Sequence, residues 1–213
     1  MGKKKALVFY GGWEGHEPEV FGKAFQKSLL EAGFAVTLSN ALEVLDDQPS
    51  LFEFDVIVPF WTIGTLSEEQ SNNLQEVVKA GTGLAGIHGG MGDAFRGNLD
   101  YEWMVGGHYV GHPFIDDYEV RVTQPDHETV SGLNPSFIYN SEQYYMLMDP
   151  GVNVLAETIY FYEDKPVTMP VIWTKEWGKG RVFYSALGHT WKEMIDHPAV
   201  WEMSIKGIQW ASR

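Results

Sequence analysis

The chain of 213 residues contains no cysteine, and this absence excludes several kinds of site at once. Disulfides, thiolate nucleophiles and cysteine-based zinc sites all require the thiol group. Basic residues are also scarce, because 15 Lys and Arg stand against 29 Asp and Glu and give a formal net charge of −14. Nucleic acids and anionic membranes both select basic surfaces, so we expect neither as a partner.

Long apolar runs are missing as well, and no segment approaches the length that a bilayer-spanning helix needs. The basic start, Met1–Lys5, precedes an apolar run over Ala6–Tyr10 that is too short for the core of a signal peptide. We therefore expect a cytoplasmic protein whose first strand follows a basic tail. The length and the 44% hydrophobic content suit a single domain over residues 1–213.

The first half of the sequence alternates between strand and helix patterns. Ser67 and Gln70 have the spacing of a capping box, which predicts the start of a helix. This alternation predicts an α/β protein with a doubly wound, parallel sheet. Strands are predicted at Lys5–Tyr10, Phe34–Leu38, Asp55–Phe60 and Gly83–Ile87, and helices at Glu17–Ala32 and after Ser67.

The second half consists mainly of short strand patterns, so we expect additional strands beside the parallel ones. Gly178-Lys179-Gly180 separates two apolar runs and predicts a late β-hairpin. A helix is predicted at the end, over Pro198–Trp210. The predicted strands are Tyr118–Val122, Phe137–Asn140, Tyr144–Met148, Val154–Thr158, Val171–Trp177 and Arg181–Ala186.

The segment Gly86-Ile87-His88-Gly89-Gly90 follows the fourth predicted strand and is the most informative motif. Glycines on both sides allow a sharp turn from strand to helix, which in α/β hydrolases raises a nucleophile above the sheet. Here the raised residue is histidine. His88 could serve as a base, as a metal ligand or as a packing residue.

Further histidines and tryptophans follow predicted strands, at the edge where open α/β sheets bind ligands. Each also has an ordinary structural interpretation, since a histidine can cap a helix and a tryptophan can pack in the core. These residues are Trp13, His16, Trp61, His189 and Trp191.

Three more side chains are candidates in the second half. His108 and His112 have a spacing that would suit a metal on a helix, but the glycines and the proline around them favour a loop near the site. Glu142 precedes an aromatic run. Apolar rings beside a carboxylate would raise its pKa and suit a general acid, although an ordinary glutamate on an edge strand fits the pattern equally.

The glycine pairs of the chain do not form a dinucleotide fingerprint. In Gly11-Gly12 and Gly81-x-Gly83 the downstream glycine is misplaced for such a motif, and no acidic residue follows at the end of the second strand. We therefore expect no NAD.

Several motifs occur in a fixed order between Lys5 and Trp210, and as a set they resemble the ThuA-like (trehalose utilisation) family, which has the fold of class I glutamine amidotransferases. The motifs are Gly11-Gly12 with His16, Gly86–Gly90, Gly106-Gly107-His108, His112-Pro113, Val120–Val122 with Pro125-Asp126-His127, Ser141–Tyr145, Gly178–Tyr184, Ala186–His189 and Gly207–Trp210.

The resemblance implies a flavodoxin-like sheet with an elbow after its fourth strand. In the amidotransferases the elbow residue is a cysteine paired with a late histidine; here His88 occupies the elbow and His189 matches the late histidine. An imidazole cannot form the thioester, so we exclude glutamine amidotransferase activity. Members of the family occur with sugar uptake systems and with dehydrogenases that produce 3-keto sugars, which implies carbohydrate metabolism.

Our leading hypothesis is an enzyme that acts on a disaccharide or a 3-keto sugar as a lyase, hydrolase or isomerase. His88 or His189 would be the base that removes the proton next to the ketone, and Glu142 the acid that assists the leaving oxygen. The carbonyl would be polarised directly or through a divalent metal such as zinc. The candidates for this task are His16, His108 and His112.

The alternative hypothesis is a non-catalytic sugar-binding module with a degenerate amidotransferase pocket. In both cases flat aromatic rings would stack on the sugar, unless they belong to the core; these rings are Trp13, Trp61, Tyr144 and Trp191. The predicted hairpin and the aromatic second half are compatible with a homodimer.

Overall fold

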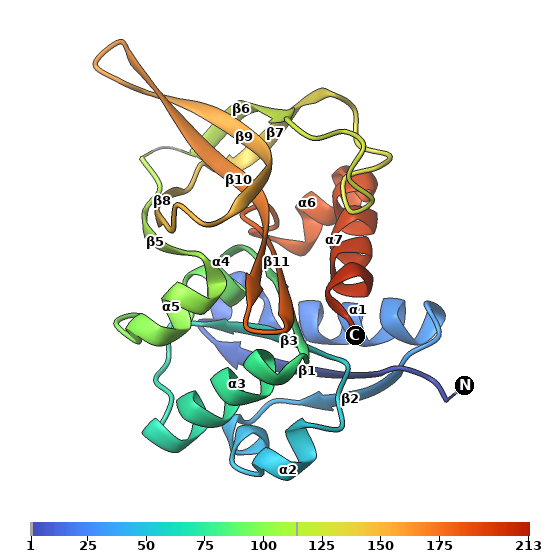
Figure 1. Ribbon diagram of the computed structural model, residues 1–213. Helices are drawn as coiled ribbons and strands as arrows, with labels where there is room; N and C mark the ends of the chain where they lie inside the picture. The colour runs from blue at the N-terminus through green and yellow to red at the C-terminus, as the bar shows by residue number, and fades with distance from the viewer. Residues whose placement is uncertain (1, 114) are drawn as a thin grey trace.

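The computed structural model describes residues 2–113 and 115–213 (Figure 1). One part of its main sheet is parallel: β1 pairs with β2 and β3, and β4 pairs with β3 and β11. These strands place their carboxyl ends at one edge of the sheet. They are β1 (Lys5–Gly12), β2 (Ala35–Ser39), β3 (Val56–Thr62), β4 (Gly83–Ile87) and β11 (Gly180–Ser185).

The other part of the sheet is antiparallel and consists of β6 (Ile115–Val122), β7 (Ser136–Glu142), β9 (Asn153–Tyr162) and β10 (Lys165–Trp177). Among the described residues, nine strands form the sheet in the order β2-β1-β3-β4-β11-β10-β9-β6-β7. The β9–β10 hairpin projects away from the parallel part (Figure 1). The predicted α/β class, with antiparallel strands and a late hairpin beside a doubly wound parallel sheet, is confirmed.

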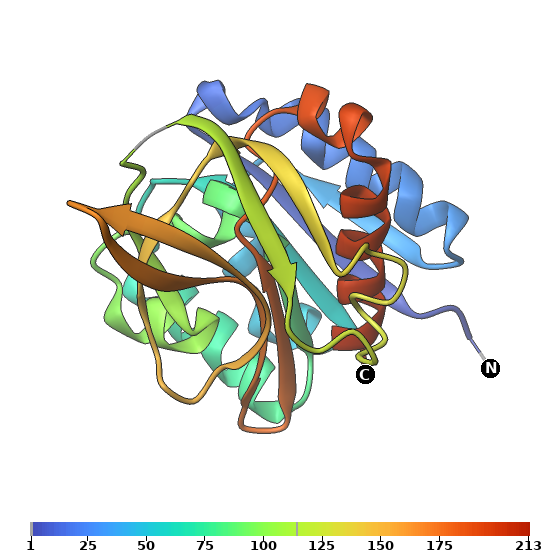
Figure 2. The same cartoon turned by 90° about the horizontal axis from the view of Figure 1, so that it is seen from above.

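Helices cover both faces of the sheet, with α1 and α7 on one side and α3 and α5 on the other (Figures 1 and 2). The longer helices are α1 (Pro18–Glu31), α3 (Glu68–Ala80), α5 (Leu99–Val105) and α7 (Pro198–Ala211). The short ones are η1 (Glu14–His16), η2 (Leu42–Leu45), α2 (Gln48–Leu51), α4 (His88–Gly92) and α6 (Trp191–Asp196). In the described part of the chain, no helix combines the length and apolar character needed to cross a membrane.

Two glycines let helices approach β11 closely from both sides. A Cβ atom at Gly207 of α7 would lie 2.3 Å from the ring of Phe183, and one at Gly180 would lie 2.2 Å from the carbonyl oxygen of Val78 in α3. Neither position has room for a side chain. The centre of the sheet, from which β4 leads to His88 and β11 leads toward His189, is therefore tightly packed.

The segment around His108 differs from the sequence prediction. It was expected as a loop, but β5 (Gly107–Gly111) pairs with β8 (Tyr145–Met148) in a separate two-stranded sheet. The register shifts between Tyr109 and Gly111, as in a β-bulge. Three glycines and a proline suggested a loop because they lack strand propensity, and the pairing with β8 outweighs that weakness.

The predicted capping box at the start of α3 is confirmed. The hydroxyl of Ser67 accepts a hydrogen bond from the backbone N–H of Gln70 at 3.1 Å, and the Gln70 side chain accepts one from the Ser67 backbone at 3.0 Å. Replacing Ser67 by Ala is expected to lower the free energy of unfolding by about 0.5–2 kcal/mol, because it leaves a helix N–H without its partner.

Urea unfolding would measure this change as a lower midpoint at an unchanged slope. The matched control is Asn72→Ala on the exposed face of the same helix, where no loss of stability is expected. Equal midpoints for Ser67→Ala and the native chain would contradict the role given to the cap.

Candidate functional site

The turn between β4 and α4 is a strand-to-helix elbow. His88 follows Ile87 directly and has φ +46°, a left-handed conformation that costs a residue with a side chain about 1–3 kcal/mol. A Cβ atom at Gly89 would lie 2.3 Å from the His16 ring, so this neighbour of the elbow has to be glycine. The predicted elbow is confirmed, and His88 is fully buried at its tip.

Hydrogen bonds fix the His88 ring and its proton. Nδ1 lies 2.8 Å from the carbonyl oxygen of Ala186, which only accepts, so Nδ1 carries the proton and donates. Nε2 lies 2.8 Å from the Tyr144 hydroxyl and 3.4 Å from Oε2 of Glu142. In the neutral ring Nε2 accepts from Tyr144; in the protonated ring it donates to one of these oxygens.

Four side chains from distant parts of the sequence meet at this point: His16, His88, Glu142 and His189. Each offers one nitrogen or oxygen, and these atoms lie within 4.8 Å of one another. They come from η1 after β1, from the elbow after β4, from the end of β7 and from the loop after β11. The convergence expected at the carboxyl ends of the parallel strands is therefore present, with β7 as an additional contributor.

His16 is held on two sides and stays neutral. Its Nδ1 lies 2.7 Å from the Thr62 hydroxyl, and its ring lies edge-on to Trp13, with the centroids 4.7 Å apart. Burial, followed by the charges of the neighbouring histidines, lowers the pKa of His16 to about 3. At neutral pH its Nε2 therefore carries no proton if Nδ1 donates to Thr62.

Glu142 has the opposite protonation state from the one its sequence predicted. Burial raises the pKa of its carboxyl, but hydrogen bonding to His88 and the charges of the surrounding imidazoles outweigh burial and lower the pKa to about 2. Besides His88, the carboxylate faces Nε2 of His112 and Nδ1 of His189, each at 3.5 Å. The expected raised pKa is wrong, because these imidazoles face the carboxylate from segments outside its own aromatic run.

Nδ1 of His189 is buried and has no hydrogen-bond partner among the described residues. Burial, followed by the charge of His88, lowers the pKa of this imidazole. Its backbone N–H donates to Glu193 at 3.1 Å, which fixes the loop that carries it. A buried nitrogen without a hydrogen bond is costly, and the Glu142 carboxylate faces it only at 3.5 Å, so a ligand between the two groups would satisfy both.

The donor set fits a divalent metal. Zinc prefers imidazole nitrogens and carboxylate oxygens, and it requires histidines that are not protonated at the ligating atom. The hydrogen bonds of His16 to Thr62 and of His88 to Ala186 occupy the nitrogens that face away from the group, as is usual behind metal ligands. The unpartnered nitrogen of His189 supplies an independent reason to place an ion here.

A cavity of about 200 Å³ opens beside this group. Trp13 lies on its wall and is 50% exposed, while Tyr144 is buried and presents its hydroxyl to His88. Burial raises the pKa of Tyr144 well above its ordinary value, so the hydroxyl keeps its proton. The lining residues are Trp13, His16, Ile63, Asp93, Arg96, Tyr109, His112, Glu142 and Tyr144.

Two of the histidines predicted as metal ligands are separated by the structure. His112 lies at the cavity, beside Glu142. His108 instead places Nδ1 3.2 Å from Oε2 of Glu102 and lines a different hollow with Trp103. His108 is therefore outside the group that could hold a metal.

Two of the predicted sugar-stacking rings are also placed elsewhere. Trp61 packs over Gly64, where a Cβ atom would lie 2.5 Å from its Nε1. Trp191 packs edge-on between Phe21 and Trp201, at centroid distances of 5.6 and 5.0 Å. Neither ring is among the described residues that line the cavity, whereas Trp13 and Tyr144 are.

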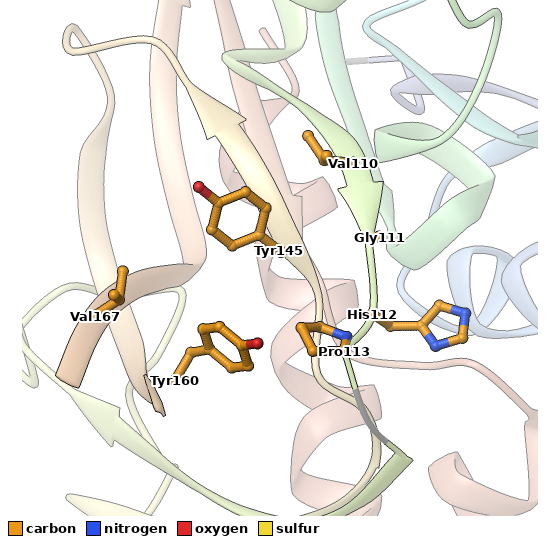
Figure 3. A pocket seen from close by; sticks show the side chains of 7 residues that line it. All are labelled: Val110, Gly111, His112, Pro113, Tyr145, Tyr160 and Val167. Carbon is orange, nitrogen blue, oxygen red and sulfur yellow. The ribbon is translucent and has the colours of Figure 1, made fainter. Parts of the chain in front are cut away.

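A larger cavity, of about 520 Å³, lies on the other side of His112 and is mainly apolar. Its walls include Tyr145 and Tyr160, and Figure 3 shows the His112 imidazole pointing away from both rings. His16, His88, Glu142 and His189 are all absent from the described residues that line it, and it shares only His112 with the smaller cavity. The smaller cavity, which His16 and Glu142 line, is therefore the candidate site.

Asp93 and Arg96 line the smaller cavity and were not singled out from the sequence. Arg96 binds Asp93 through two hydrogen bonds, which raise the pKa of the guanidinium. A signal was present, since Asp93 follows the five-residue helix of the elbow and Arg96 stands three positions later. Without the elbow geometry, an acidic and a basic residue at this spacing resemble an ordinary surface pair.

Comparison with known proteins gives a family match over nearly the whole chain. The sequence model of the ThuA family, described as trehalose utilisation, matches residues 5–211. No curated protein matches the chain significantly.

Solved structures share the fold. A protein described as ThuA-like from Bacteroides uniformis superimposes with a TM-score of 0.80 at 19% identity, over 99% of this chain and 91% of the other. A cytoplasmic protein from Salmonella typhimurium gives 0.68 at 13% identity and 99% coverage of both chains. A β-galactosidase from Bacillus circulans gives 0.63 at 15% identity, over 99% of this chain and 32% of the enzyme. These likenesses extend to the fold alone.

The low pKa of His16 predicts a loss of stability in acid. Its folded pKa of about 3 lies below the ordinary 6.5, so the unfolded chain binds a proton that the folded chain excludes. Stability is therefore complete above pH 6.5 and falls as the pH decreases toward 3. With a chelator present, the native chain should lose about 1–2 kcal/mol more between pH 7 and pH 5 than His16→Asn.

Urea unfolding at both pH values provides the measurement. The control is His127→Asn, which removes a histidine from a turn outside the site and should keep the native pH dependence. The assignment to His16 fails if both variants lose stability in parallel with the native chain.

Proposed function

The chain belongs to the ThuA (trehalose utilisation) family, and from this premise we propose that it is an enzyme that acts on a disaccharide or a 3-keto sugar by proton transfer. The observation that carries the proposal is the meeting of Glu142 with three imidazoles beside a cavity, one of them with an unpartnered buried nitrogen.

The base in this proposal is Glu142 or His189. The carboxylate is ionised at neutral pH, and the lowered pKa of His189 leaves its imidazole neutral, so both can accept a proton. In a 3-keto sugar the ketone acidifies the proton on C2. The sequence around Glu142 predicts the role of the acid, whereas this proposal makes it a candidate for the base.

The proposed reaction is an elimination. The base takes the proton from C2, and the C2–H electron pair forms the C1–C2 double bond. The bond between C1 and the glycosidic oxygen breaks; this oxygen keeps the bonding pair and takes a proton from water, and the hydroxide so formed takes the proton back from the base. Tyr144 retains its own proton. When Nε2 of His88 carries a proton, it donates to the Tyr144 oxygen, and the single proton of the hydroxyl can then be donated to the ketone oxygen as negative charge develops there.

A divalent metal would be held by His16, His88, Glu142 and His189, with zinc the closest fit to these ligands. When bound, it supplies a Lewis acid that polarises a carbonyl oxygen. Trp13 lies at the cavity as a partly exposed flat ring that can pack on the C–H face of a sugar.

Substitution of the proposed bases tests the function. Glu142→Gln and His189→Asn should each lower kcat/KM for a 3-keto-disaccharide such as 3-ketotrehalose by about 100-fold or more. Each replaces a proton acceptor by an amide side chain of similar shape that does not act as a base. The control is Leu99→Ala, an exposed position on α5 away from the cavity, where turnover should be unchanged.

Full turnover in both base variants would refute the catalytic proposal. If sugars bind to the native chain and to both variants while no turnover occurs, the protein is a sugar-binding module with a degenerate pocket.

Zinc titration tests the metal site separately. The native chain should bind one equivalent, with a rise in its melting temperature, and His16→Asn should weaken this binding by about 10-fold or more because a ligand is lost. His108→Asn is the matched control, since His108 pairs with Glu102 outside the group. Equal weakening by the two substitutions would contradict the assignment.

A further inference from the structure

Two segments beside the elbow, one directly after β3 and one after α4, are each held in an unfavourable backbone conformation. Ile63 has φ +62° and Phe95 has φ +52°, in the left-handed region that residues with side chains, and β-branched ones most of all, avoid. Two hydrogen bonds tie the segments together: Ile63 N–H donates to the carbonyl of Asp93 at 2.8 Å, and Phe95 N–H donates to the carbonyl of Ile63 at 2.9 Å. Strain of this kind collects at functional sites.

The strained segment after α4 holds an acid–base pair on the wall of the small cavity. Asp93 is buried, and Arg96 is about half exposed. Nε of Arg96 lies 2.5 Å from Oδ1 of Asp93, and one terminal nitrogen lies 2.8 Å from Oδ2. This two-point contact fixes the plane of the guanidinium, which lies 5.5 Å from the ring of Tyr109.

Both partners retain unused hydrogen-bonding capacity. A guanidinium has five N–H groups, of which two are used here, and each carboxylate oxygen of Asp93 keeps a second acceptor site. Donors and acceptors thus lie side by side on the cavity wall. A sugar hydroxyl both donates and accepts, so two adjacent hydroxyls match this arrangement.

The charges of the pair cancel. A site that selects a phosphate or a carboxylate needs a cation free of an acidic partner, and Arg96 already has one in Asp93. The Asp93–Arg96 wall therefore suits a neutral polyol better than an anionic sugar.

We propose that Asp93 and Arg96 determine substrate specificity by binding two adjacent hydroxyls of a neutral sugar, and that they discriminate against sugar phosphates and sugar acids. This inference rests on the proposed function, because it places the same sugar in the same cavity. It assigns no chemical step to either residue.

Binding of unreactive sugars by calorimetry tests the proposal. The probes are trehalose, its monodeoxy analogues and trehalose 6-phosphate. The native chain should bind trehalose about 10-fold or more tightly than it binds the phosphate and at least one monodeoxy analogue. Arg96→Lys keeps the charge but loses the planar fork, so it should weaken trehalose binding to a similar extent and bind that deoxy analogue as well as trehalose.

The deoxy comparison distinguishes hydroxyl binding from a purely structural role, since a merely loosened cavity would weaken all the sugars alike. The comparison of trehalose with its deoxy analogues on the native chain needs no variant. It therefore tests the inference even if Arg96→Lys folds poorly. Leu99→Ala is the control and should bind every probe as the native chain does.

Three results would overturn the inference: tighter binding of the phosphate, equal binding of all monodeoxy analogues by the native chain, or an unchanged pattern in Arg96→Lys. Each of these leaves the turnover loss of Glu142→Gln intact, so the proposed function survives it. Conversely, normal turnover in Glu142→Gln and His189→Asn would refute the proposed catalytic roles of these residues. If the native chain still binds trehalose more tightly than a monodeoxy analogue, the hydroxyl-binding role of Asp93 and Arg96 is supported. If none of these probes binds to the native chain, the inference fails, and turnover of the 3-keto-disaccharide alone decides the proposed function.

Discussion

Glu142 is a buried carboxylate whose two oxygens face imidazoles from three other segments of the chain. A carboxylate in such a place is costly to bury unless groups that can carry positive charge or donate hydrogen bonds surround it. The arrangement of the parallel strands serves this requirement, because β4 and β11 bring His88 and His189 to the same edge. The separate β5–β8 sheet brings His112 to the remaining side of the carboxylate.

Many of the backbone features that position these side chains can be predicted from the sequence, because they depend on neighbouring residues. The glycines around His88 predict a sharp turn, and the spacing of Ser67 and Gln70 predicts a helix start; both features are local and both are present. The protonation state of Glu142, in contrast, cannot be predicted from neighbouring residues. It depends on imidazoles about 30 to 55 positions away in the chain, as counted from the sequence, and no window around the glutamate contains them.

His108 and His112 show a second limit. Positions four apart on a regular strand lie on one face, so both histidines would point the same way. The register shift between Tyr109 and Gly111 breaks that alternation, and His108 pairs with Glu102 whereas His112 faces Glu142. The tryptophans are ambiguous for a related reason: Trp13 and Trp191 both follow strands, and only the arrangement of α1 and α7 places Trp191 against Phe21 and Trp201.

The hydrogen bond from Nδ1 of His88 to the carbonyl of Ala186 has a directional consequence for protons. A backbone carbonyl does not accept a proton outright, so the ring has no exit toward the sheet. Any proton taken up at Nε2 has to leave from Nε2, on the side where Tyr144 and Glu142 lie. The imidazole is thus a terminus and not a relay. Protons exchanged at this ring therefore pass by way of Tyr144 or Glu142, both of which line the small cavity.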